Sequence, residues 1–229
     1  MTSMLLSTIG IDMPMSFPIK PYEAVHSQIA KNKDNFLRSW NQYAGAWNAI
    51  AYRFLSCTDY NIKFIRSIKR FGNSPLPAER YKQEKCLFGF FVTGLSTVES
   101  FCYGLYAIAS MINNRSFLID KAEQLRKITV ENTTKKFKCV YPKEKISVTL
   151  SKLREDPVFQ KWKEIRNILT HRSAPGRHFF AGGDQNGEAL WLDGIQINEN
   201  TTSTRYEWLI DTLTRILNDT ELFVSHIFC

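Results

Sequence analysis

Three polar residues in one short stretch of the sequence, Arg166, Asn167 and His171, have side chains that could act on a phosphodiester. The arginine guanidinium offers planar hydrogen-bond donors to phosphate oxygens, and the histidine imidazole can take and return a proton near neutral pH. The asparagine amide can hold the imidazole or a phosphate oxygen in place. Together they suit cleavage of RNA in which the 2′-hydroxyl loses a proton, attacks its own phosphate and leaves a cyclic product. This reaction needs no metal ion, and no carboxylate cluster accompanies the three residues, so we expect neither a metal nor a cofactor.

A helix is expected to carry these residues. Asp156 can cap free backbone N–H groups at a helix start, and Pro157 suits the first helical position. The helix should continue to about Arg172, because the sequence Ser-Ala-Pro-Gly at 173–176 stops it.

The side chains of this helix should divide between two faces, because successive residues are about 100° apart. An apolar stripe is expected to face the core, formed by Val158, Trp162, Ile165 and Leu169. Asn167 and His171, four residues apart, lie together nearly opposite that stripe, and Arg166 lies on the flank. The helix therefore presents a cation, an amide and an imidazole to a ligand or to a second subunit.

The sequence from Arg166 to His171, Arg-Asn-Ile-Leu-Thr-His, resembles the Arg-x4-His motif of the HEPN superfamily (higher eukaryotes and prokaryotes nucleotide-binding). In that family a polar residue commonly follows the arginine, as Asn167 does here. The family is an α-helical bundle, often dimeric, and many members are metal-independent endoribonucleases found as toxins or in defence against phage. Other members lack activity and serve in binding or assembly. The resemblance covers residues 158–172 in detail and the helical pattern from residue 22 onward.

This resemblance implies roles for the three residues. His171 would transfer the proton, Arg166 would bind the phosphate and its developing charge, and Asn167 would orient either one. Acid and base are needed together, so a symmetric homodimer with facing motif helices would bring two copies into one cleft. RNA is the implied substrate, and an antitoxin such as a nucleotidyltransferase-like protein is a possible partner. The alternative is a catalytically silent HEPN-like module that binds nucleotide, RNA or a protein partner.

A purely structural interpretation of the motif is also open. Arg166 could pair with carboxylates around Glu164 or Asp156, and His171 could lie near a helix C-terminus, where a cation is favoured. Glu99, which lies among apolar residues, could be a functional acid or the partner of a cation from another helix. The second role is favoured for Glu99, since a buried carboxylate must be compensated. The cluster of Arg172, Arg177 and His178 could bind phosphate, but solvated loop residues are the favoured interpretation.

Length and composition predict a folded chain. The 229 residues are 44% hydrophobic and 23% charged, and nothing in this length demands more than one domain. We expect an N-terminal arm (1–21) and a single helical domain (22–229). Thirty Lys and Arg against 22 Asp and Glu give a net charge of +8, which favours anionic partners but also aids solubility. Basic stretches at 63–70 and 135–145 could guide RNA or form solvated faces.

The cysteines and the apolar segments bear on location. Five scattered cysteines without a Cys-x-x-Cys spacing suggest neither a disulfide framework nor a zinc site, which indicates a reducing compartment such as the cytoplasm. Residues 1–21 make a poor signal peptide, because Asp12 and two prolines interrupt the apolar stretch. The apolar segment 87–112 has Ser96, Thr97, Glu99 and Ser100 at its centre, so a buried bundle helix is expected there, not a membrane span.

The remaining pattern is helical. Residues 22–71 fit one long helix or two consecutive helices, and the Gly-Asn-Ser-Pro-Leu-Pro run at 72–77 should separate them from a long helix over 78–113. Residues 121–150 suggest a shorter helix followed by a loop. A β-hairpin is expected within 177–200 around the glycine-rich 182–187, and a last helix over 205–228. The expected fold is all-α: an antiparallel bundle of about four main helices with a small β-hairpin before the last one.

Overall fold

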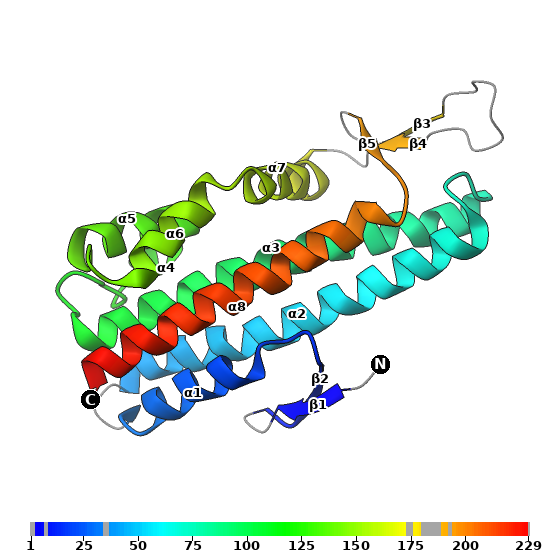
Figure 1. Ribbon diagram of the computed structural model, residues 1–229. Helices are drawn as coiled ribbons and strands as arrows, with labels where there is room; N and C mark the ends of the chain where they lie inside the picture. The colour runs from blue at the N-terminus through cyan, green and yellow to red at the C-terminus, as the bar shows by residue number, and fades with distance from the viewer. Residues whose placement is uncertain are drawn as a thin grey trace.

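The computed structural model describes residues 3–6, 9–33, 37–172, 176–179, 189–191 and 194–228. Within these ranges the fold is an all-α bundle with small β-sheets, as expected. The long elements of the bundle are α1 (Ile19–Ala30), α2 (Leu37–Phe71), α3 (Pro77–Ile112), α7 (Pro157–His171) and α8 (Asn200–Phe228). Consecutive members of this series run in opposite directions, and α3 lies in the middle between α2, α7 and α8 (Figure 1).

The long helix expected over 78–113 is α3, which begins and ends one residue earlier, and the last helix, expected from 205, begins at Asn200. The proline-rich breaker separates α2 from α3, and Pro77 is the first residue of α3. The segment predicted as one long helix or two consecutive ones holds α1 and α2, and the link at 34–36 lies outside the described residues.

The prediction for residues 121–150 was wrong. In place of one helix and a loop, the chain forms α4 (Ala122–Arg126), α5 (Val130–Val140) and α6 (Lys145–Glu155). Thr129 caps α5 by accepting a hydrogen bond from the backbone N–H of Asn132. Helix α6 buries Ile146, Leu150 and Leu153, whose spacing of four and three residues defines its apolar face. The Ser, Thr and Lys residues between these positions hid that face.

The N-terminal segment folds onto the bundle. Strands β1 (Ser3–Leu6) and β2 (Ile11–Pro14) form an antiparallel hairpin, in which Leu6 and Met13 are buried. Phe17 then packs against the rings of Tyr22 and Phe54 at 5.3 and 5.2 Å between centroids. The segment expected as an extended arm therefore contributes side chains to the core.

A small sheet precedes the last helix. Its strands β3 (Arg177–Phe179), β4 (Ala189–Trp191) and β5 (Ile195–Gln196) pair antiparallel in that order. The prediction of a β-structure here is confirmed, with one strand more than a hairpin. The glycine-rich sequence at 182–187 lies outside the described residues.

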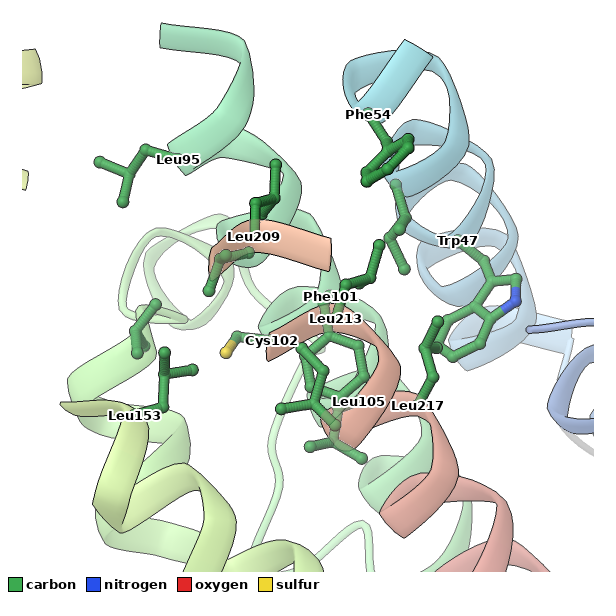
Figure 2. Packing of buried hydrophobic residues seen from close by; sticks show 14 of the residues in the cluster. Trp47, Phe54, Leu95, Phe101, Cys102, Leu105, Leu153, Leu209, Leu213 and Leu217 are labelled. Atoms are coloured by element: carbon green, nitrogen blue, oxygen red, sulfur yellow. The ribbon is translucent and has the colours of Figure 1, made fainter. Parts of the chain in front are cut away.

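The core fills the space between α2, α3 and α8. Trp47 from α2, Phe101 from α3 and Leu213 from α8 are fully buried and lie close together (Figure 2). Burying each such side chain stabilises the fold by about 2 kcal/mol. Among the described residues α3 alone is long and apolar enough to cross a membrane, but 67% of its most apolar window is buried. Helix α3 is therefore a core helix of the bundle, as the polar residues at its centre indicated.

Candidate functional site

Helix α7, which carries the motif, begins where the sequence predicts. One carboxylate oxygen of Asp156 accepts hydrogen bonds from the backbone N–H groups of Val158 and Phe159, at 2.8 and 3.3 Å. The other oxygen accepts one from the indole of Trp208, at 3.1 Å. The same carboxylate therefore caps α7 and attaches it to α8.

Trp162 fixes α7 against α3. Its indole is fully buried, donates a 2.8 Å hydrogen bond to the carbonyl of Phe91, and stacks on the ring of Phe90. This close approach requires a glycine on α3, since a Cβ atom on Gly94 would lie 2.2 Å from Cζ2 of Trp162. The buried stripe of α7 is formed by Phe159, Trp162 and Ile165.

Arg166 pairs with a carboxylate of another helix. Its Nη2 lies 2.5 Å from Oε1 of Glu99 on α3, and the Arg166 side chain is 21% exposed. The prediction that a cation from another helix compensates Glu99 is therefore confirmed. The carboxylates considered for Arg166 bind elsewhere, because Glu164 pairs with Lys161 and Asp156 caps α7. The Nε atom of Arg166 is buried without a hydrogen-bond partner in the described part of the chain.

Arg166 lies in the wall of a cleft. The cleft has a volume of about 660 Å³ and is bounded by α2, α3, α7 and the start of α5. We call it the motif cleft. Its charged lining residues are Arg53, Glu99, Glu131, Lys163 and Arg166.

Four of the five charged side chains in the motif cleft form ion pairs with one another. Lys163 forms an ion pair with Glu131, as Arg166 does with Glu99. Arg53 donates hydrogen bonds to the backbone carbonyl of Ser96 and to the Ser100 hydroxyl. Burial raises the pKa of Glu131, but the hydrogen bonds from Lys163, Thr129 and the backbone, together with the charge of Lys163, outweigh it. The pKa is therefore lowered, which keeps that carboxylate ionised. An anion entering the cleft would therefore compete with carboxylates already bound to Arg166 and Lys163.

Asn167 and His171 lie outside the motif cleft. Asn167 is half-buried and His171 is exposed in the last turn of α7. Within the described ranges neither side chain has a hydrogen-bond or ion-pair partner. His171 is five positions after Arg166, so their side chains leave the helix about 140° apart. A single chain therefore does not bring the guanidinium and the imidazole together.

Sequence reasoning missed the residues that share the cleft with Arg166. Phe159, Lys163 and Arg166 are spaced by four and three residues, which places them on one face of α7. That spacing was a signal for Lys163. No local pattern indicates Glu131, since it lies 32 residues away from Lys163.

Arg177 has a structural role that the sequence did not reveal. Its side chain is 1% exposed and contacts Glu84 at 2.6 Å, Gln83 at 2.7 Å and the carbonyl of Asn73 at 2.8 Å. The interpretation as a solvated loop residue was wrong, because β3 carries Arg177 into the junction of α2 and α3. Burial raises the pKa of Glu84, and the charge of Arg177 opposes this effect. Arg172 and His178 are exposed.

Comparisons with protein-family models, curated proteins and solved structures found no match to this chain. Across the described ranges, no group of three or more His, Cys, Asp or Glu residues is placed to hold a metal ion. What the chain does is therefore inferred from its own residues.

Proposed function

We propose that the protein is a metal-independent endoribonuclease of HEPN type, active as a homodimer in the cytoplasm, in a toxin–antitoxin or phage-defence role. One observation carries the proposal. The sequence Arg166-Asn167-x3-His171 ends a helix of an α-helical bundle, and Asn167 and His171 have no partner among the described residues. Their side chains are free to meet a second chain and an RNA strand.

The reaction follows from the chemistry of these groups. His171 of one chain removes the proton of a 2′-hydroxyl, and the resulting oxygen attacks the adjacent phosphorus. The bond from phosphorus to the 5′-oxygen breaks, and His171 of the second chain gives that oxygen a proton. The products are a 2′,3′-cyclic phosphate and a 5′-hydroxyl.

Arg166 would stabilise the charge that develops on the phosphate oxygens. Its ion pair with Glu99 uses Nη2, which leaves Nη1 for a phosphate oxygen. Asn167, on the same helix face as His171, would orient the imidazole or hold the phosphate. The dimer is required because Arg166 and His171 of one chain lie on different sides of α7.

The test is incubation of purified protein with mixed RNA in a metal chelator. Wild-type protein should produce fragments with 2′,3′-cyclic phosphate ends, and His171→Ala should lose at least about a hundred-fold in rate. His178→Ala removes an exposed histidine seven residues further on and is the matched control, with full activity expected. Equal cleavage by wild type and His171→Ala would contradict the proposal.

A catalytically silent HEPN-like module is the second candidate. The ion pair between Arg166 and Glu99 favours it, because a guanidinium already neutralised has less attraction for phosphate. Such a module would bind RNA, nucleotide or a protein such as a nucleotidyltransferase-like antitoxin without cleaving anything. RNA binding with no fragments in the chelator experiment would select this candidate.

A further inference from the structure

A second groove lies between the C-terminal end of α2 and the N-terminal end of α3. Its volume is about 500 Å³. Figure 1 shows the two helix ends side by side, beyond the region that α7 covers. Cations from both helices line it: Lys63, Arg66 and Arg70 from α2, and Lys82 and Lys85 from α3. We call it the basic groove.

The positive charge of the basic groove is largely unmatched. Glu79 is the one carboxylate among its described lining residues, and it pairs with Lys82 at 2.7 Å. The other four cations have no ion pair within the part of the chain that the structure describes. The motif cleft differs in this respect, since Lys163 and Arg166 each hold a carboxylate there. The basic groove is therefore the more favourable of the two places for an anion.

Helix dipoles do not account for these cations. Arg70 lies in the last turn of α2, where a positive charge is favoured. Lys63 and Arg66 lie before that turn, beyond the reach of the effect. Lys82 and Lys85 are the sixth and ninth residues of α3, so they too lie beyond the turn in which the dipole acts. An anionic ligand would offset the mutual repulsion of these like charges.

The groove has a fixed shape. The Tyr60 ring packs against α3 so closely that a Cβ atom on Gly89 would lie 2.4 Å from Cε2 of that ring. Lys63, Lys85 and Cys86 line the groove together, and burial raises the pKa of the Cys86 thiol while the charges of the two lysines lower it. Arg70 lies 5.0 Å over the ring of Phe71, which is 39% exposed. Cations and aromatic rings thus line the basic groove together.

Single-stranded nucleic acid has the chemistry that fits the basic groove. Its successive phosphates match a row of separate cations, and its bases stack on aromatic rings. We propose that the basic groove binds the phosphodiester backbone of single-stranded RNA, with Tyr60 and Phe71 available for base stacking. The choice of RNA as the nucleic acid rests on the proposed function.

The basic groove is connected to the motif helix through Arg177. Arg177 binds Glu84, and the next residue, Lys85, lines the groove. Six residue steps lead from His171 to Arg177, so their Cα atoms are at most about 22 Å apart. One RNA strand can therefore contact the groove and reach the end of α7.

The test measures binding without cleavage. A fluorescent single-stranded RNA with 2′-O-methyl groups lacks the nucleophile, so the full-length protein cannot cleave it by the proposed reaction. The groove variant is the triple Lys63→Gln, Arg66→Gln, Lys85→Gln. The matched control is the triple Lys31→Gln, Lys33→Gln, Lys152→Gln, which removes the same charge from exposed residues outside both basic stretches. Circular dichroism checks that both variants keep the helical fold.

The groove variant should bind the RNA about ten-fold or more weakly. The slope of the logarithm of its binding constant against the logarithm of the salt concentration should be smaller by about 0.7 for each phosphate that the protein no longer neutralises. The control should lose less than about three-fold. Equal losses in both triples, or no loss in either, would overturn the proposal. Tighter binding to phosphatidylserine vesicles than to RNA, lost in the groove variant, would also overturn it in favour of a membrane ligand. If binding depends on the groove but the wild type does not cleave natural RNA, the proposal that the basic groove binds RNA is supported and the proposed ribonuclease activity is contradicted.

Discussion

The guanidinium of Arg166 and the carboxylate of Glu99, 67 residues apart in the chain, form an ion pair of 2.5 Å that joins the motif helix to the central helix of the bundle. The pair is partly screened by water, because the Glu99 side chain is 38% exposed. Its effect on stability is therefore expected to be modest. Its effect on the position of Arg166 is larger, since it holds the guanidinium at the wall of the motif cleft.

A double-mutant cycle measures this pair. The variants Glu99→Gln, Arg166→Gln and the combination of both should give a coupling energy of about 0.5 to 1 kcal/mol in urea unfolding. Because water and ions screen the pair, the coupling should decrease in high salt. A coupling of zero at low salt would show that the two side chains do not interact in solution.

Substitution of Gly94 by alanine should destabilise the protein by about 1 to 3 kcal/mol, because the added Cβ atom would overlap the buried indole of Trp162. Gly45→Ala is the matched control, since a Cβ atom there meets nothing within 4 Å. That control should be neutral or stabilising by up to about 1 kcal/mol through helix propensity. Thermal unfolding of the two variants beside wild type checks both values. Equal stabilities would contradict the close packing of α7 on α3.

Removal of the Arg177 side chain should be costly. Arg177→Met leaves the half-buried carboxylate of Glu84 without its cation, so we expect a loss of about 3 kcal/mol in the free energy of unfolding. The double variant Arg177→Met, Glu84→Met should recover part of the loss, because no uncompensated charge remains. Arg172→Met, at an exposed position, should change stability by less than about 0.5 kcal/mol. A similar small effect for Arg177→Met would contradict its role as an anchor.

Stability should fall in mild acid because of His26. Burial lowers the pKa of His26 below its ordinary value of 6.5, and Glu23 opposes this only in part. The unfolded chain therefore binds a proton more readily than the folded chain, and stability decreases as the pH falls below about 6.5. Urea unfolding of wild type and His26→Gln at pH 7.5 and 5.5 tests this. The variant should lose less stability between the two pH values, and an equal loss would exclude His26 as the cause.

Sequence reasoning predicted the features that depend on local patterns. Asp156 and Pro157 mark the start of α7, and the proline-rich breaker marks the turn between α2 and α3, because capping and proline geometry act within a few residues. The need for a cation near Glu99 was predictable from its apolar surroundings. The identity of that cation was not, since the pair joins distant segments. Burial of Arg177 was also hidden, because its partners lie more than 90 residues earlier in the chain.

The three candidate site residues are close together in the sequence but their side chains do not all lie close together in the structure. Arg166, Asn167 and His171 are neighbours in the chain, yet the helix directs Arg166 into the motif cleft and leaves His171 at the exposed end. Whether they act together depends on a second chain, and the sequence carries no local signal of dimer geometry.

The carboxylate of Asp156 serves two helices at once, and this has a consequence for any attempt to transplant the motif. The start of α7 is held by an indole of α8, and its middle is held by the carbonyl of Phe91 on α3. A peptide of α7 alone lacks both attachments, and a helix of 15 residues is marginal in water by itself. The six residues from Arg166 to His171 are thus not a portable unit, and the smallest fragment able to present them correctly includes α3 and the last helix of the chain.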